Sequence, residues 1–99
     1  MQHHVYFWLK EERQNEADRA TFEAGLNKLG KISYIQDCGW GKPAATPKRP
    51  VVDNSYDYGV YSTFATVADH DAYQIDPQHD EFVENFKDWW ANVSIMDVE

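Results

Sequence analysis

Cysteine is almost absent from the sequence, since Cys38 is the only one among 99 residues. A single cysteine cannot close an internal disulfide, which excludes the disulfide-stapled secreted class and predicts a reduced, cytoplasmic protein. The apolar stretch at residues 3–9 is short and runs into the charged residues 10–13, so no secretion signal is indicated. No hydrophobic run approaches the length of a membrane span, and we expect no membrane association.

Basic residues are also scarce, with nine Lys and Arg against 17 Asp and Glu and a formal charge of −8. This balance argues against nucleic acid and against an anionic membrane surface as partners. Proline is rare outside one segment, because three of the four prolines fall within residues 41–50. We interpret that segment as one long surface loop and predict a single domain over residues 1–99.

The rest of the chain alternates between strand and helix patterns. Strands are predicted at residues 3–9, 32–40, 56–64 and 93–98 from apolar alternation. Helices are predicted after the capping residues Asn15, Thr66 and Asp76, and Gly30 suits the turn that ends the first helix. The order β-α-β-β-α-β predicts an α+β protein with a ferredoxin-like antiparallel sheet and both helical segments on one face.

The second face of such a sheet has no cover from the chain itself. Tyr6 and Trp8 fall on that face, opposite the face that carries Val5 and Phe7. A contiguous apolar sheet face usually marks an interface, and a two-fold dimer is its simplest cover. We therefore expect a homodimer through the outer sheet face.

The helix that begins at Asp76–Pro77 carries the most informative pattern. Its inner stripe is apolar except for one histidine, and comprises His79, Phe82, Val83, Phe86, Trp89 and Trp90. Burial and the positive end of the helix both disfavour the protonated imidazole, so His79 is expected to be neutral. A neutral imidazole facing a core serves as a general base, a hydrogen-bonding strut or a packed ring.

Four stretches of the sequence resemble one known family. They are His-Val-Tyr-Phe-Trp-Leu-Lys (4–10), Asp-Cys-Gly-Trp-Gly-Lys (37–42), Ser-Tyr-Asp-Tyr (55–58) and, most specifically, Ala-Tyr-Gln-Ile-Asp-Pro-Gln-His (72–79) followed by Phe82. Across nearly the whole chain the sequence resembles the stress-responsive A/B barrel domain family. The resemblance implies a dimeric α+β barrel in which two sheets face each other, with a pocket between each sheet and its own helices.

One class in that family, olivetolic acid cyclase, is a polyketide cyclase that needs no metal or organic cofactor. The resemblance implies that His79 is the catalytic base and that Tyr73 assists it; it also matches His3 and Trp90 to family positions. Asp76 departs from the histidine that the family often has before the motif proline. That change of charge is expected to raise the pKa of a neighbouring imidazole.

In the implied mechanism, His79 removes a proton alpha to a carbonyl and Tyr73 hydrogen-bonds the enolate oxygen, which starts an intramolecular aldol closure. The alternative is that these two side chains hydrogen-bond each other and tie two helices together. The function stays open between a cofactor-independent cyclase- or lyase-like enzyme and a non-catalytic stress-response or ligand-binding protein. A haem- or flavin-dependent oxygenase is disfavoured, because no cofactor-binding pattern is present.

The expected ligand is a small hydrophobic carbonyl compound. The residues expected to line its pocket are His3, Val5, Phe7, Phe22, Leu26, Tyr58, Val60, Phe82 and Trp90. We expect no cofactor and no metal, because no cysteine or carboxylate stands at ligand spacing from His3 and His79. The basic loop 42–50 either covers the pocket or is simply solvated, and the oxygen-rich segment 53–57 either holds a hard cation or forms a solvated turn.

Overall fold

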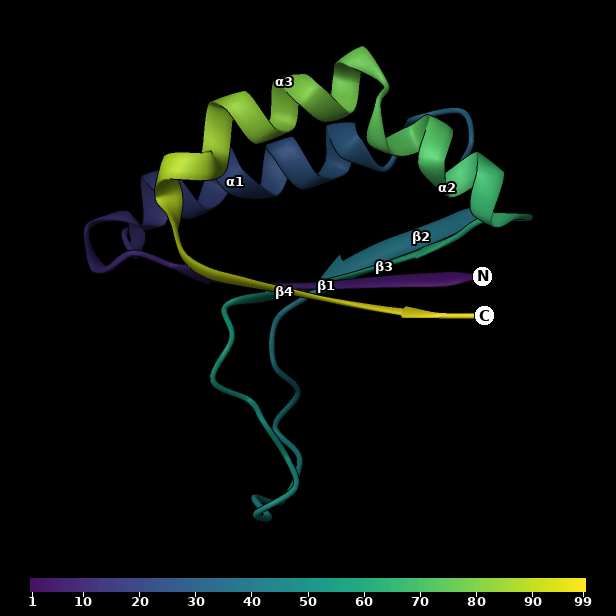
Figure 1. Ribbon diagram of the computed structural model, residues 1–99. Helices are drawn as coiled ribbons and strands as arrows, with labels where there is room; N and C mark the ends of the chain where they lie inside the picture. The colour runs from purple at the N-terminus through teal and green to yellow at the C-terminus, as the bar shows by residue number, and fades with distance from the viewer.

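Three α-helices lie in one layer over a four-stranded antiparallel sheet in the computed structural model, which describes residues 1–99 (Figure 1). The strand order is β2-β3-β1-β4. The strands are β1 (Gln2–Leu9), β2 (Asp37–Gly41), β3 (Tyr58–Thr63) and β4 (Trp90–Val98). The helices are α1 (Glu16–Leu29), α2 (Val67–Gln74) and α3 (Pro77–Phe86), with 3-10 turns η1 (Glu11–Arg13) and η2 (Lys87–Trp89). This is the predicted ferredoxin-like α+β fold.

All three helix starts carry the predicted capping residue. The side chain of Asn15 accepts a hydrogen bond from the backbone N–H of Asp18 at the start of α1. Thr66 does the same at α2, and Asp76 caps α3 with Pro77 in the first turn. Each cap satisfies an amide that has no partner inside the helix. None of the helices combines the length and the apolar character that crossing a bilayer requires.

The predicted strand 32–40 is wrong in its first half, because β2 begins only at Asp37. Residues 31–36 continue from the end of α1 as turns, in which the backbone N–H of Ile32 donates to Leu29 and that of Ile35 to Ile32. Ile32 is buried at 3% exposure and so closes the helix end over the core. Its apolar side chain fits a strand pattern and a buried turn equally well.

The boundary between α3 and β4 also differs from the sequence prediction. Trp90, expected on the helix stripe, is the first residue of β4, and the strand starts three residues earlier than predicted. Trp89 belongs to η2, where its ring packs on Phe86 and lies under the guanidinium of Arg13. The short 3-10 segment turns the chain from the helix layer into the sheet.

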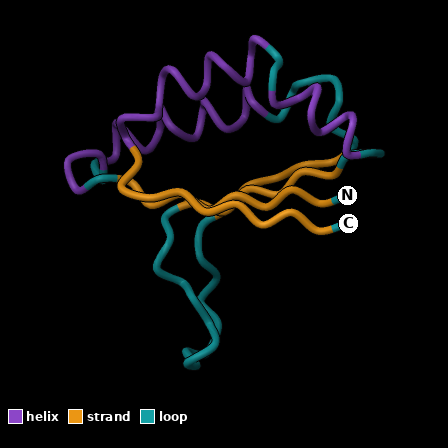
Figure 2. Tube along the Cα trace, viewed as in Figure 1, coloured by secondary structure: helices purple, strands orange, loops and turns teal.

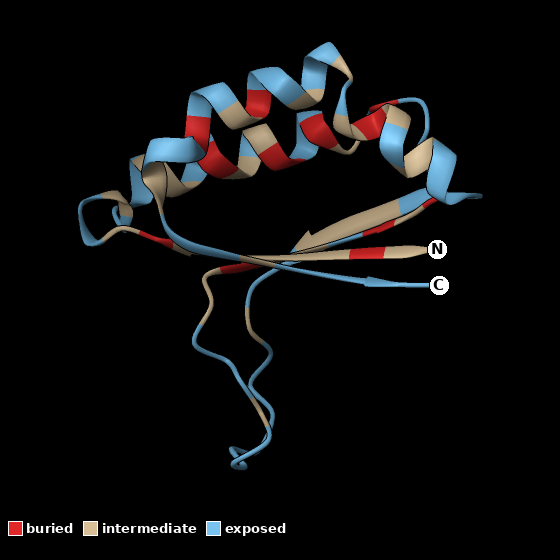
Figure 3. Ribbon diagram, in the orientation of Figure 1, coloured by how far each residue is buried: buried red, intermediate tan, exposed pale blue.

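The core lies between the helices and the inner sheet face, where the buried residues gather in Figure 3. Phe22 and Tyr58 have no exposed surface and their rings pack 5.2 Å apart. The cluster comprises Phe7, Leu9, Phe22, Leu26, Leu29, Ile32, Tyr58, Phe64, Tyr73, Phe82 and Phe86. Most of β4 is exposed, and it is an edge strand of the sheet.

Residues 42–57 form two side-by-side segments that project from the sheet on the side away from the helices (Figures 1 and 2). We call this segment the arm. It contains the basic loop, which therefore does not cover a pocket on the helix side. The base of the arm packs on the outer sheet face, where Tyr56 contacts Tyr6 and the indole N–H of Trp8 donates to Ser55.

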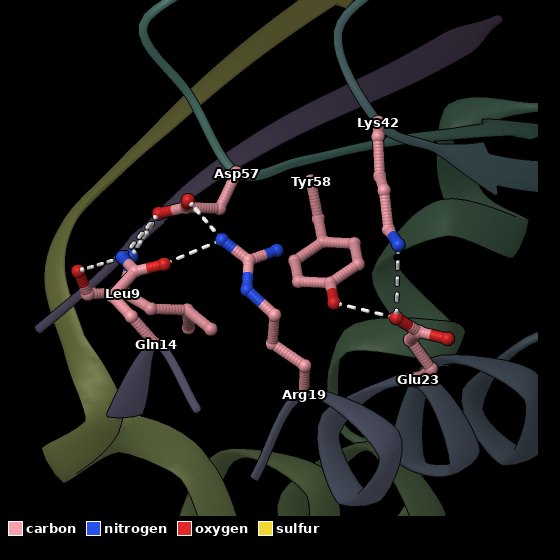
Figure 4. Close-up of polar contacts among 7 residues, drawn as sticks. All are labelled: Leu9, Gln14, Arg19, Glu23, Lys42, Asp57 and Tyr58. Carbon is pink, nitrogen blue, oxygen red and sulfur yellow. Dashed lines mark hydrogen bonds and ion pairs between the residues drawn. The ribbon is translucent and has the colours of Figure 1, made fainter. Parts of the chain in front are cut away.

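A polar network fixes the base of the arm to α1 (Figure 4). The carboxylate of Asp57 accepts from the backbone N–H of Leu9 at 2.7 Å and pairs with Arg19 at 2.7 Å. The hydroxyl of Tyr58 donates to Glu23 at 2.7 Å. Burial, followed by the Glu23 contact, raises the pKa of Tyr58 to about 12. The network holds β3 in register under the helix layer.

Candidate functional site

A cavity of about 220 Å³ opens between α3, the end of α2 and the β1–β4 side of the sheet. We call it the His79 cavity. Its lining is mostly apolar and comprises His3, Val5, Phe7, Leu29, Tyr73, Gln74, His79, Phe82, Val83, Trp90, Val93 and Ile95. A largely apolar cavity with a few polar groups is the usual form of a small-molecule site.

His79 is held in the first turn of α3, directly after the Asp76–Pro77 helix start. Its Nδ1 is buried and has no hydrogen-bond partner. Burial lowers the pKa of His79, and the smaller effects of Asp80 and Asp76, which act in the opposite direction, do not reverse it. Burial therefore favours the neutral imidazole, as predicted, and Asp76 acts in the expected direction, raising the pKa of His79 by less than burial lowers it.

Tyr73 lies on α2 beside His79, at 3% exposure. The two rings meet edge to face with centroids 4.8 Å apart, and no hydrogen bond joins them. The alternative in which this pair forms a hydrogen-bonded strut is therefore wrong. Burial raises the pKa of the Tyr73 phenol, so the hydroxyl remains a proton donor at neutral pH.

A further polar group at this cavity is the indole N–H of Trp90, which is buried without a hydrogen-bond partner. Leaving a buried donor or acceptor unpaired costs about 1–3 kcal/mol. Two of the residues that line one apolar cavity thus carry an unpaired nitrogen. Both nitrogens are shielded from solvent by the residues around them.

Five of the nine residues predicted to line a pocket meet at the His79 cavity: His3, Val5, Phe7, Phe82 and Trp90. Phe22 and Tyr58 lie behind this wall in the closed core. Leu26 and Val60 line a second cavity of about 240 Å³, which we call the Cys38 cavity. Leu29 and Tyr73 line both cavities and lie between them.

The thiol of Cys38, which lines the second cavity, is a weak nucleophile. Its thiol lies near the backbone carbonyl of Gly30, with 3.4 Å between Sγ and the oxygen. Burial raises the pKa of Cys38, so the reactive thiolate is disfavoured.

Two polar residues that the sequence analysis did not select lie next to His3. Nδ1 of His3 is 2.5 Å from Oδ1 of Asp97, and the ring centroid of His70 is 4.7 Å from that of His3. Burial lowers the pKa of His3, while Asp97 acts in the opposite direction. A carboxylate at ligand spacing from His3 is therefore present, contrary to the sequence analysis.

Solved structures share this fold across almost the full chain. A protein from Arabidopsis thaliana superposes with a TM-score of 0.81 at 20% identity, covering 99% of this chain and 92% of that one. A Dabb family protein from Mesorhizobium loti, described as ferredoxin-like, gives 0.77 at 20% identity with coverage of 99% and 93%. The hydroxynitrile lyase of Passiflora edulis gives 0.77 at 20% identity with coverage of 96% and 87%.

At this level of identity the structures show a shared fold and nothing finer. No protein of curated function matches the chain in sequence. The profile of the stress-responsive A/B barrel domain matches residues 1–99, as the resemblance implied. The chain belongs to the stress-responsive A/B barrel domain family.

Proposed function

We propose that this protein is a cofactor-independent enzyme that moves a proton on a small hydrophobic carbonyl compound, as a polyketide cyclase-like or lyase-like catalyst. His79 is the general base and Tyr73 the hydrogen-bond donor to the developing oxyanion. The observation that carries the proposal is the neutral, unpaired imidazole at the wall of an apolar cavity. A base held neutral by burial accepts a proton without first losing one.

The size of the His79 cavity limits the substrate. An apolar cavity of about 150 Å³ holds benzene, which corresponds to roughly 25 Å³ per heavy atom. On that scale a cavity of about 220 Å³ holds a ligand with about nine heavy atoms. A longer poly-β-keto chain needs the Cys38 cavity as well, and Leu29 and Tyr73 lie between the two.

Hydroxynitrile cleavage is a second candidate, supported by the fold shared with the Passiflora edulis enzyme. In that reaction a base takes the hydroxyl proton of a cyanohydrin, the bond to the nitrile carbon breaks and cyanide leaves with the electron pair. The products are a carbonyl compound and hydrogen cyanide. A phenyl cyanohydrin has about the number of heavy atoms that the cavity volume allows.

The test uses acetophenone, whose methyl protons exchange slowly with D₂O. Proton NMR of the intact protein with this ketone measures deuterium entry at the methyl carbon. We expect acceleration by the wild type, a loss of about 100-fold or more in His79→Ala, and a loss of about 100-fold in Tyr73→Phe. His4→Ala is the control, because His4 lies on the outer sheet face and pairs with Met96.

The alternative is a non-catalytic ligand-binding or stress-response protein of the same fold. It predicts that acetophenone raises the melting temperature while exchange stays at the buffer rate in every variant. Cleavage of mandelonitrile, monitored by the absorbance of the benzaldehyde released, distinguishes a hydroxynitrile lyase from an enzyme that only exchanges the ketone protons. If His79→Ala retains wild-type exchange, the imidazole is not the base and the proposal fails.

The proposal includes a homodimer through the outer sheet face, in a cytoplasmic protein. Similar folds from Thermobifida fusca and Bacteroides fragilis are described as dimeric. In this chain Tyr61 and Met96 are exposed at 44% and 60%, and they lie on the outer sheet face. The arm projects on this same side and is in position to contact a partner sheet.

Sedimentation velocity at micromolar concentration tests the dimer. Tyr6→Glu or Met96→Glu is expected to give monomers, because a charge would be buried between the two sheets. Tyr34→Glu is the matched control, since Tyr34 is 41% exposed in the turn after α1 and lies outside the sheet. A wild-type protein that sediments as a monomer rejects this part of the proposal.

A further inference from the structure

Two imidazoles and one carboxylate converge at the end of the sheet where the two chain termini lie side by side (Figure 1). They belong to His3 on β1, His70 on α2 and Asp97 on β4. One potential ligand atom from each lies within 4.8 Å of the other two. No other group of three such side chains in the molecule meets this condition.

The fold itself brings these residues together. His3 and Asp97 are cross-strand partners in the β1–β4 ladder, and alternation places both side chains on the helix side. α2 covers this end of the sheet and directs His70 onto His3. The ring of Phe64 packs against both imidazoles, at 6.3 Å from His3 and 5.5 Å from His70, and so holds them next to each other.

We propose that His3, His70 and Asp97 bind one divalent transition-metal ion of the zinc class. Imidazole with carboxylate is a donor set that zinc accepts, and three protein ligands leave a fourth position for water. Adjacent ligands on a tetrahedral ion with bonds of about 2.1 Å lie about 3.4 Å apart. The present separations of up to 4.8 Å therefore need to close by roughly 1.4 Å.

The side chains that must move, Asp97 and His70, are more exposed than His3. Asp97 has 43% of its side-chain surface exposed and His70 has 14%, while His3 is buried. Bound metal would replace the His3–Asp97 hydrogen bond, whose 2.5 Å is too short for two ligands of one ion. The carboxylate of Asp71, 3.2 Å from Nδ1 of His70, stands where an outer partner of a metal-bound histidine is usually found.

The ion would connect β1, α2 and β4 next to the His79 cavity, which His3 also lines. Because β4 is an edge strand and its far end is exposed, a link to α2 would add stability there. This inference is independent of the proposed proton transfer, since His79 is not among the ligands. Either proposal can fail without the other.

Cobalt(II) absorption on the untagged, EDTA-treated full chain is the test. We expect one Co²⁺ per chain with the intense visible bands of a tetrahedral site, displaced by Zn²⁺, and a melting temperature that rises with Zn²⁺. His70→Gln and Asp97→Asn are each expected to weaken binding by about 100-fold. Circular dichroism verifies that each variant keeps the fold.

The matched control is His4→Gln, which removes a histidine one residue from His3 but on the opposite sheet face. It is expected to bind Co²⁺ as the wild type does. Absence of stoichiometric binding at sub-millimolar Co²⁺ overturns the inference and leaves His3–Asp97 as a simple hydrogen-bonded pair. Equal binding by wild type, His70→Gln and Asp97→Asn overturns it as well, because the ion would then be held elsewhere.

Discussion

Leu29→Ala provides a direct test of how the two inner cavities divide the space between helices and sheet. Leu29 is 7% exposed and lines both the His79 cavity and the Cys38 cavity. Removing its outer carbons joins cavities of about 220 and 240 Å³ and roughly doubles the space open to one ligand. The variant should therefore accept longer ligands than the wild type.

The stability cost of this change can be derived from burial. Three buried carbons at about 0.8 kcal/mol each give about 2.4 kcal/mol. The additional cavity cost is small, because the new void merges with space that already exists. We expect a loss of about 2.5–3 kcal/mol, near the lower end of the Leu→Ala range, and a melting temperature lower by roughly 10–24 °C.

The assay is a thermal-shift series with phenyl ketones of increasing chain length, together with urea denaturation. Wild type should be stabilised by acetophenone and not by hexanophenone, whereas Leu29→Ala should be stabilised by both. Leu26→Ala is the matched control, because Leu26 is also buried on α1 but lines only the Cys38 cavity. If Leu26→Ala and Leu29→Ala respond alike to hexanophenone, Leu29 does not separate the two spaces.

Three other predictions concern stability and are measured by urea denaturation. In EDTA, the free energy of unfolding should decline as the pH falls below about 6.5, because burial lowers the pKa of His79 in the folded state while the unfolded imidazole protonates at its ordinary value. His79→Gln should make this decline with pH less steep. An unchanged pH dependence would show that His79 is not the group responsible. Gly25→Ala should destabilise the protein by about 1–3 kcal/mol, since the added Cβ on α1 would lie 2.4 Å from the Phe86 ring on α3. A stabilised variant would show that these two helices move apart at little cost. Asp57→Ala should cost about 2 kcal/mol by leaving the Leu9 amide without its acceptor, whereas the exposed Asp53→Ala should change stability by less than about 0.5 kcal/mol.

Local signals in the sequence were sufficient to locate the helices. The caps at Asn15, Thr66 and Asp76 act on amides two or three residues away, so their effect does not depend on the rest of the fold. The strand at 32–40 failed at its start for the opposite reason. Whether Ile32 lies in a strand or in a turn depends on the space under α1, which no neighbouring residue specifies.

The same difference separates the residues of the candidate site that were predicted from those that were missed. Tyr73 and His79 were selected because they stand in one short motif, and the structure brings their rings into contact. His70 and Asp97 were missed, although His70 precedes Tyr73 by one helical turn and Asp97 alternates with Val93 and Ile95 on the inner face of β4. These spacings indicate which face of the helix or strand each residue lies on. Predicting the contact of Asp97 with His3 also requires the register of β1 against β4.

The surroundings of His79 and His3 differ in ways that suit the two proposed roles. His79 is surrounded mainly by apolar groups and has no carboxylate hydrogen-bonded to its ring, so the neutral imidazole is favoured, as the proposed base requires. His3 is also buried, but the edge strand places a carboxylate at its Nδ1 and α2 adds a second imidazole. Proton transfer needs the first arrangement, and metal coordination needs the second. Asp97→Asn should therefore weaken metal binding by about 100-fold while leaving acetophenone exchange at the wild-type rate, and a simultaneous loss of both would show that the two sites act as one.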